Sequence, residues 1–191
     1  MTRSEALIIV DKLVKSQNIR KHLLAAEAAM EGLYRYFAAN ARKPELNEEA
    51  WALVGLLHDA DYEAWPDEHP RRIVALLRER GEEDLADAIN AHATSRTGVQ
   101  PRSLMDKALV ACDELSGFLH ACALVRPDRL RGLERKSVQK KLKSTSFAAK
   151  VDRAEIQAGV VALGVDLDAH IAMIVAALRE HEEELGLLPP G

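Results

Sequence analysis

Apolar side chains recur every three or four residues along most of this chain. The longest series is Ile19, Ala26, Met30, Leu33 and Phe37. This spacing gathers the apolar side chains on one face of an α-helix, whereas a half-buried strand would alternate apolar and polar residues. Helical spacing runs through every long segment, and no alternating pattern competes with it. The sequence therefore predicts an all-α fold without a β-sheet.

Residues that favour the start of a helix stand before several apolar series. They are Ser4, Ser16, Asn47, Asp152 and Asp166. Each has a side-chain oxygen that can accept a hydrogen bond from a free backbone N–H in the first helical turn. Residues 61–68 contain Pro66 and are predicted to form a loop, as are residues 93–101. A long helix is expected from Ser103 to Leu124.

The composition favours packed helices over a β-sandwich. Hydrophobic residues make up 48% of the 191 residues and aromatic residues only 4%, so Leu, Val, Ile and Ala must fill the core. Ala and Leu are good helix formers, while strands prefer aromatic and β-branched side chains. A chain of this length suits one domain. We expect a single domain over residues 1–191, with a core at about 16–125 and a helical extension at 126–188.

The chain carries no sign of secretion or of membrane insertion. Its start does not resemble a signal peptide, and no apolar run approaches the roughly 20 residues that span a bilayer. Cys112 and Cys122 lack the partners of a zinc knuckle or a disulfide framework. We therefore expect a reduced, cytoplasmic protein without a membrane partner.

Charge is distributed unevenly along the chain. The net charge is −4, yet residues 126–153 contain ten Lys or Arg against three acids, a net +7 that leaves −11 for the rest. Such a segment is typical either of an anion-binding patch or of a solvated face. A solvated face is favoured for most of these residues. No aromatic residues alternate with the charges, so the pattern does not favour a nucleic acid as partner.

Ionisable residues interrupt several apolar helix faces. The apolar run LVGLL ends in the adjacent pair His58 and Asp59. His22 lies on the apolar face of the long series described above, and Asp113 lies in the middle of a largely apolar helix. Such groups are unfavourable when buried without a partner, and they are ligands for Fe, Mn, Co and Zn. The alternatives are a satisfied core histidine for His22 and an ion pair, for example with Lys107, for Asp113.

Two more histidines are candidates for the same cleft. His92 shares a predicted inward stripe with Leu85 and Ile89. His69 stands before Pro70 at a predicted helix start. Both positions are compatible with a second metal site beside the first. The alternative is a single metal, with His69 capping its helix and His92 binding a phosphate group of the substrate.

The order His22, His58-Asp59 and Asp113 resembles the His…His-Asp…Asp signature of the HD superfamily of metal-dependent phosphohydrolases. The resemblance covers roughly residues 19–124. Within this range, AINAHATSRTG and MDKALVACDEL are similar to segments of the HD family that hydrolyses diadenosine tetraphosphate symmetrically. HDADYE departs from the usual continuation in that family. The resemblance implies an HD-domain helical bundle with extra C-terminal helices.

The resemblance and the chemistry of phosphate hydrolysis together suggest roles for individual residues. The expected ligands of one or two divalent ions of Fe, Mn, Co or Zn are His22, His58, Asp59, His69, His92 and Asp113. Asp59 would bridge two ions, and Asp61 would orient the attacking hydroxide or accept its proton. Arg96 and Lys107 would bind phosphate. The implied function is hydrolysis of a phosphate ester or anhydride in a small, nucleotide-like substrate.

Two other functions fit the same residues. Some HD proteins resemble a mixed-valence di-iron oxygenase, which uses the same six ligands to activate O₂ on a diol or a phosphonate. A non-catalytic HD module that binds a nucleotide is the third function, and the intact ligand set argues against it. The basic residues and the closer resemblance favour hydrolysis.

Overall fold

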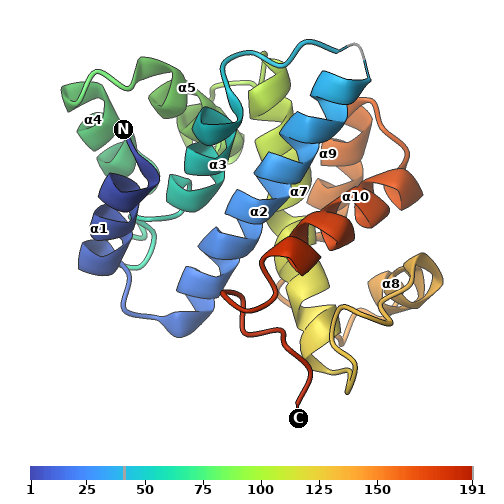
Figure 1. The fold of residues 1–191 in the computed structure, drawn as a ribbon. Helices are drawn as coiled ribbons and strands as arrows, with labels where there is room; N and C mark the ends of the chain where they lie inside the picture. Colours follow the sequence, from blue (N-terminus) through green and yellow to red (C-terminus); the bar gives the residue numbers. More distant parts are fainter. Residues whose placement is uncertain (41, 191) are drawn as a thin grey trace.

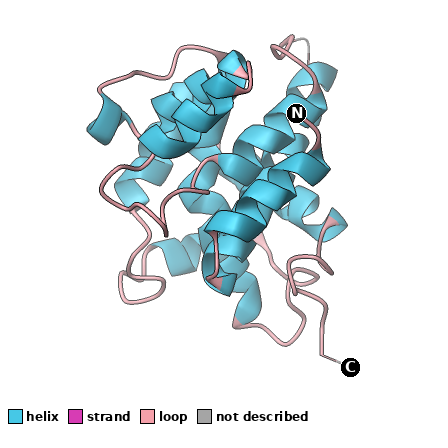
Figure 2. Cartoon of the chain, turned by 90° about the vertical axis from the view of Figure 1, so that its left-hand side faces the viewer, coloured by secondary structure: helices cyan, strands magenta, loops and turns pink. Residues whose placement is uncertain are grey.

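The computed structural model describes residues 1–40 and 42–190, and these residues contain ten α-helices and no strand (Figure 1, Figure 2). The prediction of an all-α fold is therefore confirmed. The helices are α1 (Arg3–Leu13), α2 (Gln17–Ala39), α3 (Glu48–Leu57), α4 (Arg71–Glu79), α5 (Glu83–His92), α6 (Thr94–Thr97), α7 (Leu104–Leu124), α8 (Arg135–Leu142), α9 (Arg153–Leu163) and α10 (Leu167–Glu180).

Most helix starts follow the cap residues expected from the sequence. Four of the five predicted cap side chains accept a backbone N–H in the first turn of a helix, namely Ser16, Asn47, Asp152 and Asp166. α1 differs, because its cap is Thr2 and not Ser4. The Thr2 hydroxyl accepts the N–H of Glu5 at 3.3 Å, while the Glu5 carboxylate accepts the N–H of Thr2 at 2.7 Å. This reciprocal pair satisfies two backbone donors at once, which explains the earlier start.

The segments around the candidate ligands differ in detail from the expected ones. α3 stops one residue before His58, which is its C-cap residue. α4 starts after Pro70, so His69 lies just outside the helix and does not cap it. Residues 94–97 form the single-turn helix α6 where the sequence predicts a loop. Gly98 ends this turn with a φ of +75° and donates its N–H back into it.

α2 runs through the middle of the molecule and packs against α3, α7 and α10 (Figure 1). Its side chains Leu23, Met30 and Leu33 are fully buried. α3 lies so close to α2 that a Cβ at Gly55 would be 2.5 Å from the carbonyl oxygen of Ala26. Only glycine permits this approach, which sets the N-terminal half of α2 beside the C-terminal end of α3.

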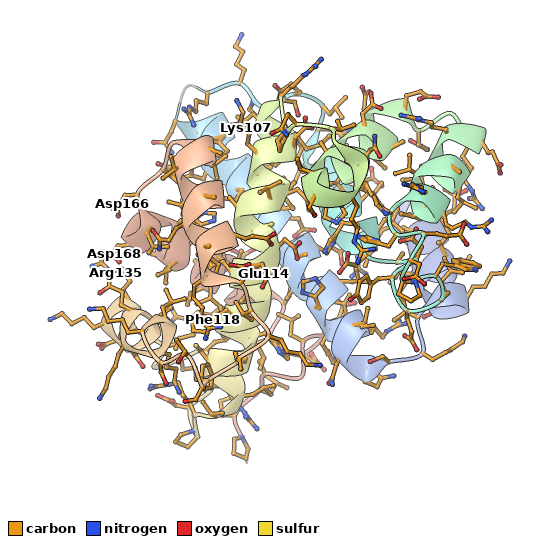
Figure 3. All side chains as sticks on the ribbon, turned by 180° about the vertical axis from the view of Figure 1, so that it is seen from behind. Lys107, Glu114, Phe118, Arg135, Asp166 and Asp168 are labelled. Carbon is orange, nitrogen blue, oxygen red and sulfur yellow. The ribbon has the colours of Figure 1, made fainter. Side chains whose placement is uncertain are left out.

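α7 links this central pair to the C-terminal extension. It packs against α2 and also against α9, which lies alongside it (Figure 3). A Cβ at Gly159 of α9 would be 2.7 Å from the Cα of Ala111 in α7. The close approach holds the C-terminal extension firmly against α7.

Arginine side chains of the basic segment 126–153 hold its own loops. Arg153 donates hydrogen bonds to four backbone carbonyl oxygens of the loop before it, those of Ser144, Phe147, Ala148 and Val151. Arg129 likewise donates to a carbonyl oxygen at the end of α7. Lys136 and Lys140 of α8 are exposed. The interpretation as a solvated face therefore fits these lysines and not the two arginines.

Among the described residues, none of the helices alone has the length and apolar character that crossing a membrane requires. α9 and α10 reach that length and composition only together, and the pair is bent by 98° at the break between them.

Candidate metal centre

Side chains from α2, α3 and α7 meet beside the close contact of α2 with α3. The Nε2 atom of His22 lies 3.0 Å from Nε2 of His58 and 3.1 Å from Oδ1 of Asp113. Nε2 of His58 lies 3.3 Å from the same oxygen. His58 is fully buried, while His22 and Asp113 retain partial exposure. These three donor atoms therefore face a common point that solvent can reach from one side.

Asp59 faces this group with one carboxylate oxygen and a second pair of histidines with the other. Its Oδ2 lies 3.6 Å from Nε2 of His22 and 3.8 Å from Nε2 of His58. Its Oδ1 lies 3.2 Å from Nε2 of His69 and 3.5 Å from Nε2 of His92. Two groups of three residues result, one of His22, His58 and Asp59 and the other of Asp59, His69 and His92. Within each group the ligand atoms lie within 4.8 Å of one another. Asp59 belongs to both groups and joins them.

The spacing of these donors suits a transition-metal ion. Two ligands bonded at about 2.1 Å lie about 3.0 Å apart at an angle of about 90° and about 3.4 Å apart at a tetrahedral angle. The observed separations of 3.0–3.8 Å are close to these values. Imidazole nitrogen and carboxylate oxygen are ligand types that Fe, Mn, Co and Zn accept. The residues present therefore fit one or two such ions.

Backbone carbonyl groups orient two of the imidazole rings. Nδ1 of His58 donates to the carbonyl oxygen of Gly55 at 2.8 Å, three residues earlier on α3. Nδ1 of His92 donates to the carbonyl oxygen of Ile89 at 2.5 Å, also three residues earlier. A proton on Nδ1 leaves Nε2 with a free lone pair in the neutral ring, directed at the other donors.

Asp61 orients the ring of His69 in the same way. Its Oδ1 accepts a hydrogen bond from Nδ1 of His69 at 2.7 Å, and its Oδ2 accepts the N–H of Ile73 in α4 at 2.9 Å. The side chain is fully buried. The sequence predicts that Asp61 faces the nucleophile, whereas the structure engages both of its oxygens with protein N–H groups behind the ring of His69.

The histidine and aspartate side chains of the centre stabilise each other's charged forms. Burial on its own would lower the pKa of His22, but the hydrogen bond to Asp113 and the charges of Asp113 and Asp59 raise this pKa to about 9. Burial would raise the pKa of Asp59, but the neighbouring imidazole groups of His58 and His92 lower it. The centre therefore stabilises positive charge in a buried place, which is the electrostatic condition for binding a metal cation.

The two predicted phosphate-binding cations lie in different places. Arg96 of α6 is exposed and donates from Nη1 to the carbonyl oxygen of Pro66 at 2.7 Å, so it holds the loop before α4. Lys107 lies at the start of α7 (Figure 3). It stands six residues before Asp113, which corresponds to about 9 Å along the helix axis. It lines a separate hollow with Arg42, against α9. Of the two, only Arg96 contacts the loop that leads to His69.

Two residues outside the predicted ligand set, Glu114 and Gly117, lie against the centre. Glu114 of α7 accepts the N–H of Asp152 at 3.1 Å and so ties α9 to α7 (Figure 3). Burial and the charge of Asp113 raise the pKa of Glu114 to about 7. A Cβ at Gly117 would lie 3.3 Å from Nδ1 of His22. Gly117 lies four residues after Asp113, so helix spacing predicts that the two are neighbours. No local sequence pattern predicts the hydrogen bond between Glu114 and the N–H of Asp152.

The structure brings all six predicted ligands together from separate stretches of the chain. In the part of the chain that the structure describes, two groups of His and Asp side chains could hold a metal ion, and they share Asp59. The geometry of these groups is the basis for assigning a function. No family model, curated protein or solved structure matches this chain.

Proposed function

We propose that this protein is a metal-dependent phosphohydrolase of the HD type, which cleaves a phosphate ester or anhydride in a nucleotide-like substrate. The position of Asp59 carries the proposal. Its two carboxylate oxygens face two different pairs of imidazole nitrogens, at 3.6 and 3.8 Å on one side and at 3.2 and 3.5 Å on the other. A carboxylate that bridges two metal ions needs this arrangement.

The two donor groups define which residues each ion would use. The proposed ligands are, for the first site, His22, His58, Asp59 and Asp113 and, for the second, Asp59, His69 and His92. When bound, the ions supply Lewis acidity to the phosphoryl oxygens and lower the pKa of the attacking water. The protein fixes the ligands in advance, since the Nδ1 hydrogen bonds hold the rings with Nε2 facing inward.

Asp61 is a positioning residue in this proposal. Its negative charge keeps the proton of His69 on Nδ1, which leaves Nε2 as the ligand atom. The N–H of Ile73 in turn holds the carboxylate of Asp61. A change at Asp61 is therefore expected to act through His69 and through the second site.

Arg96 would bind the phosphate group of the substrate. A guanidinium group carries five N–H donors in one plane. Arg96 can therefore hold the carbonyl oxygen of Pro66 through Nη1 and still donate to a phosphoryl oxygen. Lys107 has no part in the proposal because it lies at the far end of α7.

The all-helical fold supports the HD assignment. His22, His58-Asp59 and Asp113 come from α2, from the end of α3 and from α7, and they follow the His…His-Asp…Asp order. We assign residues 16–125 to the HD-type core, with α8, α9 and α10 as the extra C-terminal helices.

Metal analysis and phosphate release test the proposal together. Protein purified without a chelator should contain about two equivalents of transition metal and release phosphate from nucleotides in a substrate panel. A chelator should abolish the activity, and added Mn²⁺ or Fe²⁺ should restore it. Asp59→Ala should remove both the metal and the activity. His181→Gln replaces a histidine outside the two donor groups and should retain both.

The double variant His69→Ala/His92→Ala separates one bound ion from two. A fall from about two equivalents to about one supports the binuclear form. About one equivalent in both proteins means that His69 and His92 are not ligands. Protein that binds no metal and releases no phosphate with added Mn²⁺ refutes the proposal. Turnover that requires O₂ and releases no phosphate would replace it with the di-iron oxygenase alternative.

A further inference from the structure

The few aromatic side chains of this chain are distributed unevenly. The chain has three Tyr, two Trp and three Phe, and large ones such as Phe37, Trp51 and Phe118 are almost completely buried. Among the described residues, the most exposed aromatic side chains are Tyr62, at 42%, and Trp65, at 37%. Both lie in the loop between the two histidine pairs of the candidate metal centre. Aromatic exposure is therefore concentrated in this loop.

This loop is held in place by hydrogen bonds to three other parts of the molecule. Oε2 of Glu63 accepts the N–H groups of Lys15 and Ser16, each at 2.9 Å. The carbonyl oxygen of Pro66 accepts a hydrogen bond from Arg96 at 2.7 Å. The carboxylate of Asp61 ties the loop to α4. The two aromatic side chains are therefore exposed on a fixed support.

Tyr62 and Trp65 point to different surfaces. The ring of Tyr62 meets the ring of His69 at an angle of 81°, with centroids 5.4 Å apart. Nε2 of that histidine lies 3.2 Å from Oδ1 of Asp59, so Tyr62 forms the rim of the candidate metal centre. Trp65 packs against Arg72, with the guanidinium carbon 5.6 Å from the ring centroid. It lines a separate hollow of about 410 Å³ between α1 and α4.

We infer that Tyr62 is a substrate-binding residue that stacks on the base of a nucleoside monophosphate. The inference rests on the proposed function, because it places the phosphate group of the substrate at Asp59. In a nucleoside 5′-monophosphate the base is one ribose away from the phosphate. Tyr62 is similarly one imidazole ring away from Asp59. An aromatic side chain can accept any base in this position, because every base has a π-face.

Charges near the centre favour one phosphate group over a polyphosphate chain. Glu114 is adjacent in sequence to Asp113, and Glu155 lies in the first turn of α9. Above the pKa of about 7 that Glu114 has here, these acids add negative charge on the α7 side. Each further phosphate group directed there would meet repulsion.

Binding of two ligands that differ only by a base tests the inference. Adenosine 5′-monophosphate and ribose 5-phosphate are titrated into the metal-loaded protein, with KM measured instead of Kd where phosphate is released. Wild type and Tyr62→Phe should prefer the nucleotide by about fivefold or more. Tyr62→Leu should reduce this preference to about one while binding ribose 5-phosphate as before. Trp65→Leu is the matched control and should keep the preference.

Three outcomes would overturn the inference. One is a wild-type protein that shows no preference for the nucleotide, including one that binds neither ligand. Another is a Tyr62→Leu protein that keeps the preference. A third is equal weakening of both ligands in Tyr62→Leu, which would mean that Tyr62 only positions His69. Metal content measured on the same samples separates the two proposals, because a protein without metal contradicts the proposed function, whereas a metal-loaded protein without base preference contradicts only this inference.

Discussion

The candidate metal centre and the basic segment 126–153 are both rich in ionisable groups, yet they use them in opposite ways. In the metal centre the donor atoms point at one another, as in the 3.0 Å approach of His22 Nε2 to His58 Nε2. In the basic segment the guanidinium groups of Arg129 and Arg153 donate to backbone carbonyl oxygens, as in the bonds from Arg153 to the loop before α9. The first arrangement directs ligand atoms at a shared point, and the second satisfies the backbone of a loop.

The difference teaches that a high density of charged residues does not by itself identify a site. A neutral histidine has one donor and one acceptor nitrogen, so a ring fixed through Nδ1 still offers Nε2 to a ligand. An arginine has donors only. When a loop uses them, as with Arg153, little capacity is left for an external anion. What each polar atom already binds therefore matters more than how many charges a segment carries.

Arg153→Ala should have the largest effect on stability. Four carbonyl oxygens lose a charged donor. Bonds of this type contribute about 1.5–3 kcal/mol each and do not add fully within one network. We expect the free energy of unfolding in urea to fall by about 3 kcal/mol, with the metal content of the folded protein unchanged. Lys140→Ala, at an exposed position of α8, is the control and should change stability by less than about 0.5 kcal/mol. Loss of metal from folded Arg153→Ala protein would contradict the conclusion that the basic segment stabilises its own loop independently of the metal centre.

Asp61→Asn should have the next largest effect, and it should be confined to the metal centre. The substitution removes the charge that orients His69, so the affinity for the second metal ion should fall by about 10–100-fold. Chelator competition followed for each ion measures this change. Asp67→Asn, in an exposed part of the same loop, is the matched control. Equal weakening of both ions would mean that Asp61 supports the whole fold and not one ligand.

The smallest effect is expected for an ion pair that joins the C-terminal extension to α2. Nε2 of His181 lies 2.9 Å from Oε2 of Glu31. The hydrogen bond to Glu31 raises the pKa of His181 above its ordinary value of 6.5, although burial acts against it. The pair therefore stabilises the fold fully below about pH 6.5, and this contribution is lost as the pH rises through the folded-state pKa. Because the pair is partly exposed, the contribution should stay below about 1 kcal/mol.

Urea unfolding of wild type and His181→Gln in metal-free buffer measures this contribution. The difference in the free energy of unfolding between the two proteins should be larger at about pH 6 than at about pH 9. A difference that grows with pH has the opposite sign and would exclude the ion pair as its source.

Much of the candidate site could be predicted because its members carry local signals. His22 and His92 lie on apolar helix stripes, and the pair His58-Asp59 ends an apolar run. Helix periodicity decides which face is buried, so these side chains had to point into the core. The all-helical fold follows from the same periodicity. Neither the distances between the donors nor their division into two groups can be derived from spacing alone.

Other features could be predicted only from the path of the chain in the fold, or from a closer reading of the helix periodicity and capping signals. The position of Asp61 depends on how the loop before α4 folds back, which residue spacing does not specify. The position of Lys107 could have been derived, because six residues turn a helix by about 600° and place Lys107 about 120° from Asp113 around α7. The true start of α1 was also readable, since Thr2 and Glu5 have the three-residue spacing of a capping box.

The close contact at Gly55 sets the distance between α2 and α3. It therefore also sets the separation of two proposed ligands that lie on these helices next to the contact. His22 lies four residues before Ala26 on α2, and His58 lies three residues after Gly55 on α3. A side chain that wedged the two helices apart at Gly55 would move these two imidazole rings apart. Conversely, an ion held by both rings would clamp the two helices together. For substitutions at this contact between α2 and α3, metal uptake and resistance to thermal unfolding should therefore rise and fall together, even when the substituted residue touches no ligand.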